Sequence, residues 1–200
     1  TMASIFQPSA SPHRGSYAGY FRLAKSGLEE PMSTHSDHYH TNSAYSSAAY
    51  SKGAVFLEQL GYVIGSEVRD RGMHRYWNTW QFKHPNVNDF VRVMEKESGL
   101  ELDWYKEYFV NSTKTIDYGV KEVKASSIGT EITLERIGLM PMPIDLVVTY
   151  KDGSKEMVYL PLVMMRGEKS EEAGMAKRVM TEAWPWTNPT KTILLTRPFA

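Results

Sequence analysis

The spacing of apolar residues changes near residue 112, and this change limits the fold more than any other feature of the sequence. Before that point, apolar side chains recur at the three- and four-residue intervals typical of helices with one buried face. After it, they alternate with polar side chains, as in strands that have one buried face. The pattern predicts an α+β protein with an all-helical region over residues 1–112 and a small antiparallel β-sandwich over residues 113–200.

Five helices are expected in the first region. They are placed at residues 17–24 and 44–64, after an N-cap at Ser66, after the capping pair Asn86 and Asp89, and at residues 102–109. The second helix should bury one face made of Tyr50, Ala54, Leu57, Leu60 and Ile64. The third should bury a heavy aromatic face made of Val68, Met73, Tyr76, Trp77 and Trp80.

The second region carries the signals of short strands and tight turns. Alternation predicts strands around residues 116–120, 132–134, 144–150, 157–159 and 192–196. The pair Asp152-Gly153 lies between two alternating runs, and it predicts a hairpin because tight hairpin turns need positive φ angles. Residues 166–189 show no clean period and are expected to form a long loop with at most one helical turn.

Composition excludes several classes of function. The 23 Lys and Arg residues balance the 23 Asp and Glu residues, so no basic surface indicates nucleic acid as a partner. The sequence has no cysteine, which excludes disulfides, thiolate zinc sites and cysteine nucleophiles. No apolar run approaches the ~18 residues of a membrane helix, and no signal peptide is visible at the start. The compartment stays open.

Three histidines, His35, His38 and His40, cluster in a polar stretch between the first two expected helices. Imidazole is a common ligand of transition metals, so one interpretation is a metal site. Their spacing matches no established zinc pattern, and the alternative is a loop whose histidines form local hydrogen bonds. The acidic pairs Glu29-Glu30 and Glu171-Glu172 are expected to be solvated surface.

The segment Tyr45-Ser46-Ser47-Ala48-Ala49-Tyr50-Ser51-Lys52-Gly53 opens the second expected helix. Taken alone, it describes two tyrosines that pack at a helix start, with a glycine that allows close contact. It also resembles a stretch of the zinc aminopeptidases of the aminopeptidase N and leukotriene hydrolase family, the gluzincins. The resemblance extends over roughly residues 14–123, and more loosely over the β region. It continues through four further segments: Gly53-Ala54-Val55-Phe56-Leu57, Phe82-Lys83-His84-Pro85, Asn88-Asp89-Phe90 and Ser98-Gly99-Leu100-Glu101-Leu102.

The resemblance implies a role for Tyr50 in a peptidase. In the family, zinc held by two histidines and a glutamate polarises the carbonyl of a peptide substrate, and a tyrosine hydroxyl stabilises the oxyanion that forms. Tyr50 matches that tyrosine, and Tyr45 matches a neighbour close to the substrate. The helical region would then be the end of a thermolysin-like catalytic domain, and the zinc would be a cofactor of the parent protein.

The chain departs from the family pattern because it contains no H-E-x-x-H motif. The resemblance places that motif upstream of residue 1, in a missing N-terminal catalytic segment that would be a partner of this chain. We therefore expect a chain that is inactive alone, holds no zinc and lacks its last strand. The alternative is an inactive interaction module that uses an open sheet edge, for example to form a homodimer.

Overall fold

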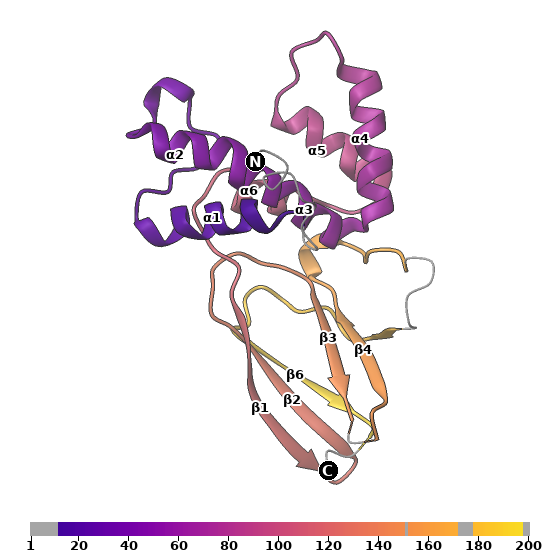
Figure 1. The fold of residues 1–200 in the computed structure, drawn as a ribbon. Coiled ribbons are helices and arrows are strands. Elements are labelled where there is room, and N and C mark those ends of the chain that lie inside the picture. Colours follow the sequence, from indigo (N-terminus) through magenta and orange to yellow (C-terminus); the bar gives the residue numbers. More distant parts are fainter. Residues whose placement is uncertain (1–11, 151, 172–177, 198–200) are drawn as a thin grey trace, which may run out of the picture.

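The computed structural model describes residues 12–150, 152–171 and 178–197, and these form a helical region and a β region. Figure 1 shows the helices gathered at one end, with the strands running lengthwise away from them. This arrangement confirms the α+β class. The expected boundary at residue 112 falls after the last helix and before the first strand. Its assignment as a domain boundary stays a prediction.

The helical region contains six α-helices and a π-helical segment within the described residues. They are α1 (Arg14–Ser26), α2 (Asn42–Ser46), the π-helical segment η3 (Ser47–Lys52), α3 (Gly53–Ile64), α4 (Ser66–Trp80), α5 (Val87–Ser98) and α6 (Asp103–Phe109). Their shared core contains Phe56, Leu60, Met94, Tyr105 and Phe109. Two 3-10 turns, η2 (Ser36–His38) and η4 (Val163–Met165), complete the helical elements described.

The helix ends follow local sequence signals in most places. The capping box at α5 is present, since Asn86 Oδ1 accepts from the amides of Asn88 and Asp89, and Asp89 accepts from the amide of Asn86. Gly99 ends α5 in the left-handed conformation, at φ 71°. The expected N-cap Ser66 is wrong by one residue, because Gly65 at φ 95° both ends α3 and caps α4.

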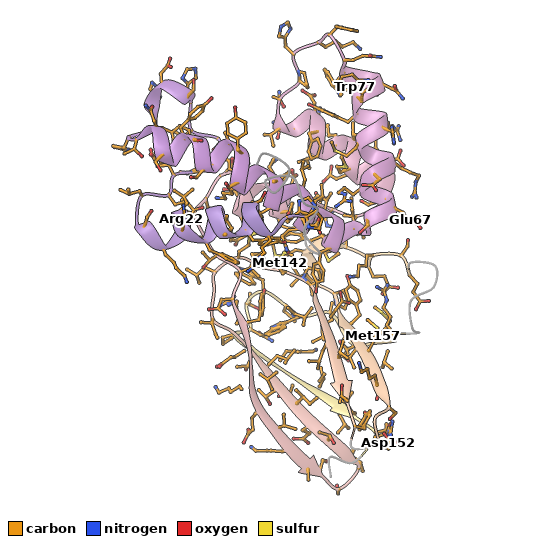
Figure 2. All side chains as sticks on the ribbon, in the orientation of Figure 1. Arg22, Glu67, Trp77, Met142, Asp152 and Met157 are labelled. Atoms are coloured by element: carbon orange, nitrogen blue, oxygen red, sulfur yellow. The ribbon has the colours of Figure 1, made fainter. Side chains whose placement is uncertain are left out.

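The expected aromatic face of α4 is also wrong. Val68 is buried, but Met73, Tyr76 and Trp80 are partly exposed, and Trp77 is 66% exposed. Helix α4 has its main packing contacts with α3 and α5, and this packing leaves Trp77 exposed. Figure 2 shows Trp77 near the end of α4 that leads into the connection to α5. The helical spacing of apolar residues does not tell whether another element of the fold packs on that face of the helix.

The β region consists of two three-stranded sheets. One has the order β1 (Tyr118–Ser126), β2 (Gly129–Arg136) and β6 (Thr190–Leu195), and the other β3 (Ile144–Thr149), β4 (Lys155–Leu160) and β5 (Arg178–Met180). Inward side chains of both sheets, together with Trp184, form the second core. The hairpin between β3 and β4 is confirmed, with Gly153 at φ 81° in its turn. Lys151 lies outside the described residues.

The expected long loop at residues 166–189 is wrong in part, because it contains β5. This short strand pairs with β4 in parallel register, so the second sheet is not purely antiparallel. Three residues are too few to show an alternating pattern. Residues 172–177 lie outside the described part of the chain.

The helical and β regions pack directly on each other. Met140, Met142, Leu162 and Met165 from the β region join the helical core, and Figure 2 shows Met142 between the two regions. The Tyr62 hydroxyl donates to Pro143 O and accepts from the Asp145 amide, at 3.1 and 2.9 Å. Over the described ranges, none of the helices has the length and apolar character needed to cross a bilayer.

Candidate active site at Tyr50

The segment that carries Tyr45 and Tyr50 begins with a conventional helix start. Thr41 precedes α2 in an extended conformation, and its hydroxyl accepts from the Ala44 amide at 3.0 Å. The chain then widens into the π-helical segment η3 before it returns to α-helix at Gly53. The sequence predicted an unbroken helix here. π-Helical turns are uncommon and are frequent at functional sites.

The wide turn changes which residues face the core. Helical spacing predicted that Tyr50 lies on the buried face, but its side chain is 74% exposed. Ala48 and Lys52 face inward instead, at 0% and 1% exposure. A π-helical turn shifts the phase of the residues that follow it, so a pattern based on the α-helical period fails across this segment. Tyr50 therefore projects outward from the turn.

Lys52 is enclosed beneath that turn. Its Nζ lies 2.8 Å from Glu29 Oε1 and donates to Ser112 O at 3.0 Å. The rings of Tyr20 and Phe109 lie 5.9 and 5.7 Å from the same nitrogen. A buried ammonium needs such partners, because an uncompensated charge in the interior is strongly destabilising. The lysine thus connects the turn to α1, α6 and the loop after α1.

Glu29 corrects another expectation. Its side chain is 5% exposed, so it is not solvated surface. Burial and, next, the nearby Glu29 carboxylate raise the pKa of Tyr20. The neighbouring Glu30 accepts from the His40 amide at 3.0 Å and lies 2.9 Å from His40 Nδ1. The hydrogen bonds from His40 lower the pKa of the Glu30 carboxyl. Glu171 is exposed as expected, and Glu172 lies outside the described residues.

Tyr45 lies close to the loop after α1. Its ring meets that of Tyr39 edge-on, with 5.5 Å between the centroids, and 41% of the residue is exposed. The Tyr39 hydroxyl donates to Pro31 O at 2.9 Å. Tyr45 and Tyr50 therefore both remain accessible, on a segment supported by the 29–43 loop.

The three histidines of that loop have separate local partners. Nδ1 of His35 accepts from the Asp37 amide at 3.3 Å, and the His35 and His38 rings lie 5.4 Å apart. His40 pairs with Glu30 instead. Within the described ranges, the ring nitrogens of the three do not converge on a common metal position. The geometry resembles the local hydrogen-bonding alternative more than a metal site.

The described residues do not fit a catalytic zinc. One group among them brings three ligand atoms within 4.8 Å of one another, and it consists of Glu95, Glu101 and Asp103. Three carboxylates without histidine do not match the nitrogen-containing ligand sets of catalytic zinc sites. Burial, as the largest cause, raises the pKa of Glu95.

Sequence reasoning missed Lys52 and Glu29 as a buried pair. The available signal was a lysine four residues after Ala48, a spacing that places both residues on one side of a helix. A charged residue at a core position requires a partner, but the sequence does not say which acid provides it.

Two comparisons with known proteins bear on this site. Residues 21–109 match the peptidase family M1 domain, a range that includes Glu29, Tyr45, Tyr50 and Lys52. The chain is also 25% identical over 129 residues to aminopeptidase N of Haemophilus influenzae, which covers 58% of this chain and 15% of that protein. The chain thus spans only a small part of the length of this relative. Together, the two findings support membership of the aminopeptidase N family of M1 peptidases.

Proposed function

We propose that this chain is part of a zinc-dependent aminopeptidase that hydrolyses N-terminal peptide bonds, and that Tyr50 acts in its chemical step. The similarity to an aminopeptidase N supports the peptide substrate and the hydrolytic reaction. The single observation that carries the residue assignment is the exposed side chain of Tyr50 on a turn that Lys52 contacts from the buried side.

The proposed role of Tyr50 is to donate a hydrogen bond to the carbonyl oxygen of the scissile peptide as negative charge develops on it. A neutral phenol is suited to this role, since it donates a proton to a hydrogen bond without adding a charge of its own. A donor that acts mainly on the oxyanion contributes to kcat and little to KM, because it binds the transition state more strongly than the substrate. Tyr45 would lie beside the substrate.

The zinc ligands would come from a part of the protein outside this chain. When bound, zinc would polarise the substrate carbonyl and activate a water molecule. We expect the 200-residue chain alone to show no turnover of aminoacyl arylamides, because it contains no H-E-x-x-H motif. Zinc-dependent turnover by the purified chain would contradict this assignment.

The test of Tyr50 uses the longer enzyme. Tyr50→Phe removes one oxygen and should lower kcat by at least about tenfold, with KM and zinc content nearly unchanged. Tyr108→Phe is the control, because its hydroxyl makes no hydrogen bond among the described residues, and kcat should not change. Steady-state kinetics with an aminoacyl arylamide measures both. An unchanged kcat for Tyr50→Phe would refute the role.

The alternative function, an inactive interaction module, rests on the sheet edges. Strand β1 is an edge of its sheet, and Val120 and Val123 on it are 55% and 40% exposed. Lys121, Glu122 and Lys124 lie on the same strand, and charges on an edge oppose pairing with a second copy. Light scattering at high protein concentration tests this alternative, and a monomer would count against a homodimer through the edge.

A further inference from the structure

The π-helical turn carries two side chains with opposite environments only two residues apart. Tyr50 is 74% exposed, and Lys52 is 1% exposed. Both belong to η3, so any rotation or refolding of this turn that releases Lys52 also moves Tyr50. The position of the tyrosine hydroxyl is therefore linked to the contacts of the lysine.

Those contacts reach three separate parts of the helical region. Glu29 belongs to the loop after α1, Ser112 follows α6, and the ring of Tyr20 is part of α1. Helix α1 also approaches η3 closely at Gly19, where a Cβ atom would lie 2.5 Å from Ser51 Oγ. The turn is thus fixed by α1 on one side and by the buried ammonium beneath it.

A buried ion pair is a poor source of stability, because desolvation of the two charges offsets much of their attraction. An apolar side chain of similar length at position 52 could fill the same space. What an apolar side chain cannot reproduce is the attraction between the ammonium and the Glu29 carboxylate 2.8 Å away, together with the hydrogen bond that Nζ donates to Ser112 O. These two contacts favour one arrangement of the turn. The pair is therefore suited to fixing geometry.

We propose that Lys52 and Glu29 are positioning residues for the reaction, and that their ion pair holds the π-helical turn so that the Tyr50 hydroxyl meets the substrate carbonyl. This inference rests on the proposed role of Tyr50. Neither residue contacts the substrate, and both act through the tyrosine. Misplacement of a reacting group by about 1 Å can cost up to ~100-fold in rate, so the effect should appear in kcat.

The test is a double-mutant cycle in the longer enzyme. Lys52→Met should lower kcat about three- to tenfold with KM nearly unchanged, since Tyr50 acts in the transition state. In the Tyr50→Phe background, Lys52→Met should have no further effect, because the hydroxyl that it positions is already gone. Lys169→Met is the control, since it removes a 2.6 Å ion pair with Asp145 at the junction with the β region, and kcat should be unchanged.

Each outcome separates the two ideas. If Tyr50→Phe lowers kcat but Lys52→Met does not, or if Lys52→Met lowers kcat equally in both backgrounds, the positioning role is overturned and the role of Tyr50 stands. If Tyr50→Phe has no effect, both fall. Thermal unfolding checks that each variant is folded. Should Lys52→Met fail to fold, Glu29→Gln replaces it in the cycle, because it removes the charge that pairs with Lys52. It should then lower kcat with Tyr50 present and have no further effect in the Tyr50→Phe background.

Discussion

Asn86 caps the start of α5 through hydrogen bonds of both its side chain and its own amide. Its side-chain oxygen accepts hydrogen bonds from two backbone amides at the start of α5, and its own amide donates to Asp89 Oδ2 at 2.9 Å. Asn86→Ala should lower the free energy of unfolding by about 1 kcal/mol, because two amides lose their acceptor. Asn78→Ala, an exposed change inside α4, should alter it by less than about 0.5 kcal/mol. Urea denaturation of the chain measures both, and equal effects would contradict the capping role.

At the residue scale, the sequence predicts a contact only when the residues that make it lie close together in the chain. The capping box is contained in four consecutive residues, so its signal is complete in the sequence. The burial of Lys52 depends on Glu29 and on Ser112, which is 60 residues away, and no local pattern specifies those partners. The role of Tyr50 came from a resemblance, while its exposure came from the structure.

At the scale of elements, the predicted buried faces were wrong where the regular α-helical period did not describe the packing of the helix. The period predicted α3 in part, since Leu60 and Ile64 are buried as expected, whereas Ala54 and Leu57 are only partly buried. Val55, Phe56 and Val63, outside the expected face, are buried as well. It failed for Tyr50 because η3 is π-helical, and it failed for α4 because the main contacts of that helix, with α3 and α5, leave Trp77 exposed. Strands of the hairpins were predictable from alternation and turn residues, whereas β5 depends on β4 for its existence. Tertiary contacts determine such elements.

Two glycines with positive φ, one at the start of β2 and one in the turn between β3 and β4, allow a test of element stability. Gly129 has φ 153°, and a Cβ atom there would lie only 1.8 Å from Leu195 O on the neighbouring strand. Gly153 has φ 81°, but a Cβ atom there would meet no atom within 4 Å. Gly153→Ala should cost about 1–2 kcal/mol, from its backbone conformation alone. Gly129→Ala should cost more than about 3 kcal/mol, because the sheet must also separate.

Thermal unfolding followed by circular dichroism compares the two glycine variants. A similar loss of stability in both variants would show that the contact between β2 and β6 relaxes easily at Gly129. The difference between them combines the overlap with Leu195 O at Gly129 and the unequal backbone conformations, φ 153° and φ 81°.

At the scale of the whole molecule, buried tyrosine hydroxyls support both regions and the junction between them. Tyr105 donates to Phe56 O inside the helical core at 2.7 Å, Tyr62 bridges to the β region, and Tyr118 accepts from the Met142 amide at 2.9 Å. Burial raises the pKa of each of these three, and that of Tyr118 reaches about 12. Burial also raises the pKa of Tyr159 to about 12.

These shifts predict alkaline unfolding. Below about pH 10, the tyrosines are protonated in both the folded and the unfolded chain, so their contribution to stability is fully present. As the pH rises from 10 toward 12, the unfolded chain loses protons that the folded chain still holds, and stability falls. Tyr118 should contribute up to about 1 kcal/mol per pH unit to this loss. Tyr118→Phe, which cannot ionise, should therefore unfold with a shallower pH dependence between pH 10 and 12 than the unchanged chain. Urea denaturation at several pH values measures the slopes, and equal slopes would show that Tyr118 ionises as easily in the folded chain as in the unfolded one.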